Sequence, residues 1–191
     1  VVIRPHVFSD FDGDGKTDVG VYRATDGMWY VNRSSNSQFS ATQFGVSSDK
    51  LTPADFDGDN KTDISIFRPA PGEWWYSKSS NGGNGAVTFG TSSDTLTPGD
   101  YTGDAKTDIA FFRPSTGSWY VLRSEDLTFY AFPFGTTGDV PVPADYDGDG
   151  KADVAVYRPS NGTWYLLRSS AGFTGFRWGI ASDVPLPNAL I

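Results

Sequence analysis

An aspartate-rich segment of nine residues occurs four times in this chain, and each copy begins 45 residues after the one before. The first copy, residues 10–18, reads Asp-Phe-Asp-Gly-Asp-Gly-Lys-Thr-Asp, and the others occupy residues 55–63, 100–108 and 145–153. A fixed period of this length is the signature of a repeat architecture, in which neighbouring units bury a common core. We therefore expect residues 1–191 to form a single repeat domain.

Each repeat shows strand patterns separated by turn signals. A strand rich in Val and Ile follows each aspartate loop, with apolar residues on both faces, which predicts that both faces are covered. A glycine turn leads to a second strand that starts with Trp, a third strand ends at an aromatic-Gly pair, and a short segment before the next loop supplies the fourth. The Trp residues are Trp29, Trp74, Trp119 and Trp164, and the pairs are residues 44–45, 89–90, 134–135 and 178–179.

Four strands in 45 residues is the unit of a β-propeller, so we predict an all-β propeller of four four-stranded blades. The metal-binding loop would join the first and second strands of each blade. The expected limits are about 5–45, 50–90, 95–135 and 140–179, with a closing segment at 180–191. A β-solenoid or a linear string of small sheets is the alternative.

The end of the chain starts to repeat the approach to a loop, but Ala189 stands where the first Asp of a fifth loop would be. Two interpretations follow. In one, the chain is a four-bladed ring whose closing segment packs beside the first blade, and we favour this one. In the other, the chain is a fragment of a longer array, or a half-propeller that assembles with another.

The spacing of the carboxylates predicts a metal site in every loop. Side-chain oxygens stand at positions 1, 3, 5 and 9, a backbone carbonyl is available at position 7, and glycine at position 4 allows the turn. Oxygen ligands in a flexible loop favour Ca²⁺, whereas zinc and copper prefer His or Cys. The candidate ligands, for up to four calcium ions, are Asp10, Asp12, Asp14, Lys16, Asp18, Asp55, Asp57, Asp59, Lys61, Asp63, Asp100, Thr102, Asp104, Lys106, Asp108, Asp145, Asp147, Asp149, Lys151 and Asp153.

Two other calcium motifs do not match this spacing. An EF-hand needs a bidentate Glu at position 12 and flanking helices, but apolar strand residues stand there. The nonapeptide repeat of calcium-binding β-helices has a much shorter period. The third loop departs from the others because Thr102 replaces the second Asp and Ala105 occupies position 6, where Gly or Asn tolerates a left-handed conformation better. We expect the third site to be the weakest.

The formal net charge is −8, and 15 of the 23 acidic side chains belong to the four loops. The basic residues form no run. A surface of this kind repels nucleic acids and anionic lipids, so we expect no DNA, RNA or membrane partner.

These loops and the aromatic-Gly pairs resemble the FG-GAP, or VCBS-like, repeats of bacterial extracellular proteins and of integrin α-subunit propellers. The loops match the family's Asp-x-Asp-x-Asp-Gly-x-x-Asp motif, and Phe44-Gly45 looks like its FG pair. In place of the family's Gly-Ala-Pro, the chain has Arg-Pro at residues 68–69, 113–114 and 158–159, which marks a bacterial-type variant. The resemblance implies a secreted or cell-surface protein that takes part in adhesion or recognition.

Three functions are weighed on this basis. The first is a non-enzymatic, calcium-stabilised module that recognises a protein or a cell surface. The second is a carbohydrate-binding lectin with one site per blade, suggested by the repeated Trp and Arg. The third, an enzyme or an accessory domain of a secreted enzyme, has little support, because His6 is the sole histidine, the chain has no cysteine, and Glu73 and Glu125 are at non-equivalent repeat positions.

Overall fold

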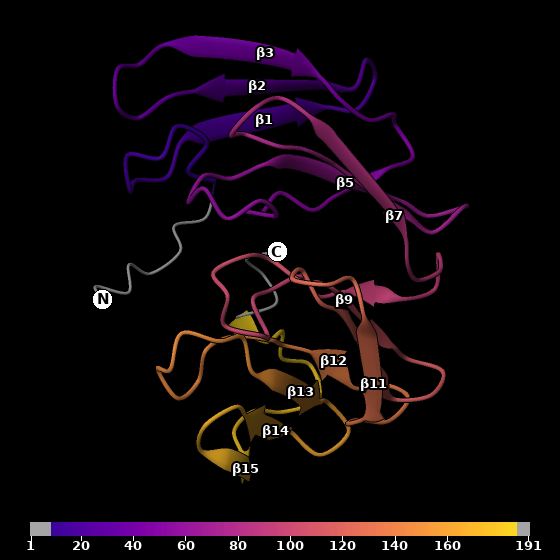
Figure 1. Ribbon diagram of the computed structural model, residues 1–191. Coiled ribbons are helices and arrows are strands. Elements are labelled where there is room, and N and C mark those ends of the chain that lie inside the picture. Colours follow the sequence, from indigo (N-terminus) through magenta and orange to yellow (C-terminus); the bar gives the residue numbers. More distant parts are fainter. Residues whose placement is uncertain (1–8, 187–191) are drawn as a thin grey trace. The chain divides into compact units, whose positions relative to one another are not determined.

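The computed structural model describes residues 9–186, and its named elements are fifteen β-strands (Figure 1). They form four separate antiparallel sheets, one for each repeat. Within this range no helix is long and apolar enough to cross a membrane. The all-β prediction is confirmed, and one small sheet per repeat is the pattern of a propeller-like fold.

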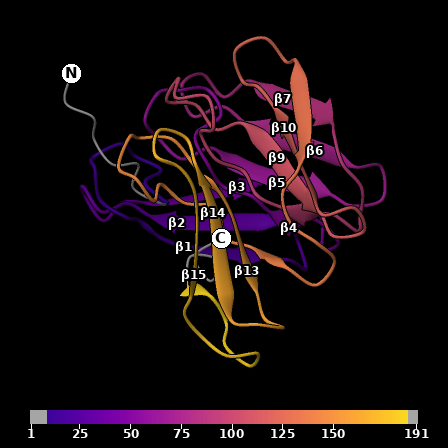
Figure 2. The same cartoon turned by 90° about the horizontal axis from the view of Figure 1, so that it is seen from below.

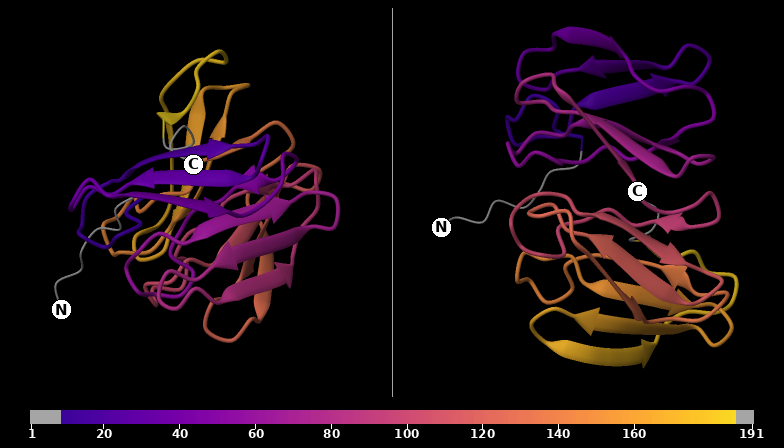
Figure 3. Two further views of the ribbon diagram at one scale, coloured as in Figure 1. Left: turned by 90° about the horizontal axis from the view of Figure 1, so that it is seen from above. Right: turned by 45° about the vertical axis from the view of Figure 1, so that its right-hand side comes forward.

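The first sheet has the order β1-β2-β3, the second β4-β5-β6-β7, the third β11-β10-β9-β8 and the fourth β12-β13-β14-β15. The first two sheets contain β1 (Val19–Arg23), β2 (Met28–Asn32), β3 (Phe39–Gln43), β4 (Lys50–Leu51), β5 (Ile64–Arg68), β6 (Glu73–Ser77) and β7 (Asn84–Thr88). The other two contain β8 (Thr95–Leu96), β9 (Ile109–Arg113), β10 (Ser118–Leu122), β11 (Phe129–Pro133), β12 (Val140–Pro141), β13 (Val154–Arg158), β14 (Thr163–Arg168) and β15 (Gly172–Arg177). Figures 2 and 3 show the strands of each sheet from further sides.

The chain divides into two compact units. The first ends at Ser92 and also takes in residues 105–107, and it contains the first two sheets. The second begins at Ser93 and contains the third and fourth sheets. The predicted blade limits, the single domain and the closed four-bladed ring stay predictions.

The aspartate loop lies between the first and second strands of the second, third and fourth sheets, as expected. The first sheet has three strands within residues 9–186, and residues 5–8, at the start of the predicted first blade, lie outside the described residues. Ala189 also lies outside them. The expectation that both faces of the strand after the loop are buried holds for β5, β9 and β13, but is wrong for β1, where Val19 and Val21 are exposed.

The repeated Trp is a structural residue of each sheet. The indole Nε1 of Trp74 donates a hydrogen bond of 2.8 Å to the carbonyl of Phe89, at the end of the third strand, and the ring is fully buried. The corresponding bond is made by Trp29, Trp119 and Trp164. A buried indole normally needs such a partner, and this bond fixes the third strand to the second.

The glycine of the FG pair is needed because it lies against the glycine of the turn that precedes the Trp-led strand, which is the turn between β1 and β2 in the first repeat. The backbone N–H of Phe44 donates to the carbonyl of Gly27 over 2.8 Å. A Cβ on Gly27, which has φ near +68°, would lie 2.4 Å from the carbonyl oxygen of Gly45. The same contact recurs in the other three repeats, so the two glycines form a single packing unit in each one.

Each of the last three sheets also contains a bidentate ion pair. Arg68 at the end of β5 bonds through Nε and Nη2 to both carboxylate oxygens of Asp49, over 3.1 and 2.9 Å. Arg113 pairs with Asp94, and Arg158 pairs with Asp139, in the same way. The aspartate immediately precedes the first strand of the sheet, so the pair ties that strand to the second.

Candidate metal centres

The aspartates at the first and ninth positions hold each loop in shape, and in the second loop both are buried. The carboxylate of Asp55 accepts the backbone N–H groups of Gly58 and Asn60, over 2.6 and 2.7 Å. That of Asp63 accepts the N–H of Phe56 over 2.9 Å and the N–H of Ser79, which follows β6, over 2.7 Å. The two carboxylates thus accept backbone N–H groups of the loop and of the segment after β6, and these hydrogen bonds hold the loop in its conformation.

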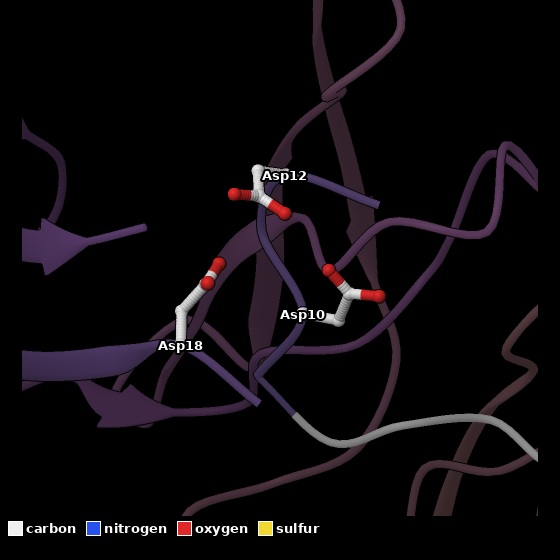
Figure 4. Close-up of side chains that lie close together, drawn as sticks. All are labelled: Asp10, Asp12 and Asp18. Carbon is white, nitrogen blue, oxygen red and sulfur yellow. The ribbon is translucent and has the colours of Figure 1, made fainter. Parts of the chain in front are cut away.

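Three of the four loops bring carboxylates together at the first, third and ninth positions. In each of these three, one carboxylate oxygen from every member lies within 4.8 Å of the others. Figure 4 shows Asp10, Asp12 and Asp18 arranged around a common space in the first loop. The other two groups are Asp55, Asp57 and Asp63 in the second loop, and Asp145, Asp147 and Asp153 in the fourth.

The predicted ligands at the fifth position are not members of these groups. The carboxylate of Asp59 accepts the backbone N–H of Lys61 and the hydroxyl of Ser79, each over 2.9 Å. Asp14 and Asp149 accept the equivalent Lys N–H. Metal ligation by these aspartates, and by the carbonyls of Lys16, Lys61 and Lys151, stays a prediction.

Serines that the sequence reasoning missed bind the third-position aspartates. The hydroxyl of Ser80 donates to Asp57 Oδ2 over 2.7 Å, and that of Ser170 donates to Asp147 Oδ2 over 2.8 Å. Ser35 makes the same bond to Asp12 in the first loop. Each serine lies 23 residues after its aspartate, in a Ser-Ser pair that follows the second strand after the loop, and this repeated pair is the sequence signal that could have revealed them.

The remaining oxygens of two of these aspartates are buried without a hydrogen bond. Asp57 Oδ1 and Asp147 Oδ1 have no hydrogen-bond partner among residues 9–186. An unsatisfied buried carboxylate oxygen is costly, and a cation is a partner that can satisfy it. Each group offers only oxygen, which suits a hard cation such as Ca²⁺ and not a metal that prefers nitrogen or sulfur.

The electrostatics of the second loop also favour a cation. Burial raises the pKa of Asp63 to about 6, although the hydrogen bonds from Ser79 and Phe56 act in the opposite direction. Burial raises the pKa of Asp108 in the third loop as well. A carboxylate with a raised pKa is poorly stabilised in its charged form, and a nearby cation would stabilise that form.

The third loop does not form such a group within the described residues. Thr102 stands at its third position, where its backbone N–H donates to Asp108 over 3.1 Å and its buried Oγ1 has no hydrogen-bond partner in residues 9–186. Ala105 has φ of +66°, so the expectation that position 6 needs a left-handed conformation is confirmed. Three of the five predicted ligands of this loop are carboxylates. The five are Asp100, Thr102, Asp104, Lys106 and Asp108. That this site binds calcium most weakly stays a prediction.

Several solved structures share this fold at low sequence identity. A virginiamycin B lyase from Staphylococcus aureus is 13% identical with a TM-score of 0.54, over 91% of this chain and 55% of that chain. A streptogramin B lyase is 13% identical with a TM-score of 0.57, over 93% and 57%. An Agrocybe aegerita lectin that recognises non-reducing terminal N-acetylglucosamine is 19% identical with a TM-score of 0.59, over 85% and 48%.

This chain therefore spans about half the length of the solved structures that it matches, and at these identities the likeness concerns the fold alone. No curated protein matches the sequence. The profile of the FG-GAP-like repeat matches residues 10–66 and 100–156, which is more than half of the chain, and each match begins at the first aspartate of a loop. The chain belongs to the FG-GAP-like repeat family.

Proposed function

We propose that this protein is a non-enzymatic, calcium-stabilised extracellular module of the β-propeller type, which recognises a protein or a cell surface. The observation that carries the calcium part is the group of three carboxylates at the same place in three repeats, two of which have a buried oxygen without a hydrogen-bond partner among residues 9–186. The FG-GAP-like family and the similarity to a lectin support the recognition part.

Calcium has a structural role in this proposal. The aspartates that would hold the ion are in a loop that also contacts the turn after the second strand, through Ser79 and Ser80 in the second repeat. An ion in the loop would thus stabilise two segments of one sheet. A ligand that binds only the folded state stabilises it by an amount that grows with its concentration.

The proposed extracellular location rests on the calcium that the loops would need. Loops of modest affinity are filled where free calcium is abundant, as it is outside cells. The proposal of a non-enzymatic role rests on the carboxylates, because each group is committed to backbone and serine donors in a repeated structural arrangement. The two lyases share the fold with this chain, and their activity is not carried over.

Thermal unfolding with and without calcium tests the proposal. We expect the melting temperature of the 191-residue chain to fall by about 10 °C or more in excess EDTA, and to recover with Ca²⁺ but much less with Mg²⁺. Asp147→Asn should reduce the calcium-dependent part of this shift, whereas Asp126→Asn, outside the loops, should leave it unchanged. A melting temperature that is the same in EDTA and in calcium would refute a structural calcium role.

Carbohydrate binding is the second candidate, favoured by the likeness to the N-acetylglucosamine-binding lectin. Against a site at the repeated Trp residues, Trp29, Trp74 and Trp119 are buried, and each indole N–H is already bonded to a backbone carbonyl. A glycan array with the calcium-loaded protein separates the two candidates. Selective binding of glycans would favour the lectin, and an array without hits would favour a protein ligand.

A further inference from the structure

Neighbouring aspartate loops are joined by a backbone hydrogen bond that recurs along the chain. In the first unit, the N–H of Thr62, at the eighth position of the second loop, donates over 2.7 Å to the backbone carbonyl of Asp10, at the first position of the first loop. The same bond, also over 2.7 Å, joins two further pairs, Thr107 to Asp55 and Ala152 to Asp100. The bond therefore belongs to the repeat and does not depend on the side chain of the donor.

The two ends of this bond adjoin carboxylates of two different groups. Asp10, whose carbonyl accepts the bond, contributes its side chain to the group in the first loop. Thr62 directly precedes Asp63, which contributes to the group in the second loop. All three residues are buried, so the bond lies in a low-dielectric environment, where hydrogen bonds are stronger. A displacement of Asp63 therefore acts on the backbone of Asp10 through one peptide bond and one hydrogen bond.

A lysine side chain makes a second contact between the same two loops. The aliphatic chain of Lys61, at the seventh position of the second loop, lies against Gly13 of the first, where an added Cβ would be 3.0 Å from both Cγ and Cε of the lysine. The N–H of Gly13 donates to Asp10 Oδ1 over 2.7 Å. The contact recurs in two further pairs, Lys106 on Gly58 and Lys151 on Gly103. The lysine thus packs on the turn that one of the carboxylates of the first loop stabilises.

Both contacts reach the network that holds the first loop in shape. Besides Gly13, the carboxylate of Asp10 accepts the N–H of Gly15 over 2.8 Å. In the second loop, the carboxylate of Asp63 accepts the N–H groups of Phe56 and Ser79. Holding either aspartate in place therefore orders its own loop and, through Thr62 and Lys61, restricts the neighbouring one.

We propose that calcium binding to the first and second loops is positively coupled through the Thr62–Asp10 bond and the Lys61 contact, so that each loop binds more tightly when the other is filled. This inference rests on the calcium sites of the proposed function. When Asp63 is held by an ion, Thr62 also loses freedom, and less entropy remains to be lost when Asp10 is ordered. The coupling is reciprocal, because each site must change the affinity of the other by the same factor.

The charge of the loops acts in the opposite direction. Each group contains three carboxylates, and filling one loop reduces the negative potential that attracts a cation to the other. Salt screens this effect, with a Debye length of about 8 Å at physiological ionic strength, whereas it affects the hydrogen bond and the lysine contact little. The coupling should therefore become more positive as the salt concentration rises.

NMR titration of the 191-residue chain in calcium buffers reads the two loops separately. The N–H of Gly15 bonds to Asp10 and reports on the first loop, and the N–H of Asn60 bonds to Asp55 and reports on the second. Each amide resonance should shift as its own loop fills. The calcium concentration at half-shift then gives the affinity of each loop.

Disabling one loop and reading the other measures the coupling. In about 0.3 M salt, Asp57→Asn should weaken calcium binding at the first loop at least about threefold, and Asp12→Asn should weaken binding at the second by the same factor. Asp147→Asn alters the fourth loop instead, and should change the affinity of the first loop by less than about twofold. Ser80→Ala, which removes the hydroxyl that donates to Asp57, is a milder second variant and should act in the same direction as Asp57→Asn.

Hydrogen exchange at Thr62 tests the path itself. In the Asp12→Asn protein, exchange of the Thr62 N–H should slow at least about fivefold as the second loop fills, and the Gly15 resonance should shift at the same calcium concentration. The N–H of Val31, in the central strand of the first sheet, should slow less. Equal slowing at Thr62 and Val31 would assign the effect to stabilisation of the whole unit, and would overturn the proposed path.

The outcomes separate this inference from the proposed function. Circular dichroism in EDTA establishes that the variants are folded, which is expected because the third-position aspartates do not hold the loop in shape. If both loops bind calcium with affinities that the variants leave unchanged, the coupling is wrong and the structural role of calcium stands. If neither Gly15 nor Asn60 responds to calcium, both proposals are wrong.

Discussion

The second and third aspartate loops share one backbone frame but differ in the groups that could hold an ion. In both, the ninth-position aspartate accepts the N–H of the second residue and the N–H of the serine after the following hairpin. Both place a residue with positive φ at position 6. The hydrogen-bonded frame is therefore maintained in the third loop although one carboxylate has been replaced.

The two loops differ at their third position and at the residue that lies 23 positions after it. The second loop has Asp57 bonded to Ser80, whereas the third has Thr102 and, at the serine position, Glu125. Only the second brings three carboxylates within 4.8 Å of one another. The comparison teaches that the first and ninth positions set the shape of the loop, while the third position determines whether three carboxylates come together.

The largest effect is expected from removing the third-position carboxylate of the second loop. Asp57→Ala should lower calcium affinity at that loop by about a hundredfold, or roughly 2.7 kcal/mol, because a charged ligand is lost. Isothermal titration should show one strong site fewer than in the unmodified protein. Thr102→Ala, the matched change in the third loop, should leave the strong sites unaltered, and an equal loss in both variants would contradict the distinction.

The metal-free protein should respond to pH through Asp63. Because the folded-state pKa is about 6 and the ordinary value is 3.8, the folded state binds the proton more tightly. The free energy of unfolding in EDTA should therefore fall as pH rises from about 4 through 6, by about 1 to 3 kcal/mol. Urea unfolding at pH 4.5 and 7 measures the change.

Asp63→Asn should remove most of this dependence. Saturating calcium should reduce or reverse it, because the ion competes with the proton for the carboxylate. The pKa of Asp108 is also raised, so Asp108→Asn should remove a further part. If the free energy of unfolding in EDTA instead rises with pH over this interval, burial does not raise the pKa of these two carboxylates.

The third loop should become a stronger site when it is given the residues of the second. Thr102→Asp combined with Glu125→Ser restores the aspartate and its serine donor, and should raise calcium affinity at this loop about tenfold or more. The single variant Glu125→Ser is the control, which should change little. Isothermal titration measures the number of calcium sites and their affinities. An unchanged calcium affinity at the third loop would show that the residue at position 3 does not determine binding.

The sequence predicts the repeated parts of this molecule well, because they depend on local patterns. The strands after each loop, the Trp-led strands and the left-handed position 6 all follow from residue type and spacing. The bond of Ser80 to Asp57 depends on two segments that the hairpin brings together, so a single serine does not indicate it, and only the recurrence of the Ser-Ser pair at a fixed distance from the aspartate does. For the same reason the partner of Arg68, which is Asp49 in the approach to the sheet, could not be inferred from the strand alone.

The smallest effect is expected from the backbone of the third loop. Ala105 has φ of +66°, a conformation that costs an alanine more than a glycine, so Ala105→Gly should stabilise the metal-free protein by about 0.5 to 1 kcal/mol. Asn60 has φ of +64° at the same position of the second loop, and because Asn tolerates this region, Asn60→Gly should change stability by only a few tenths of a kcal/mol. Urea unfolding of both variants in EDTA compares the two loops directly. Equal effects would mean that the alanine is no more strained at this position than the asparagine.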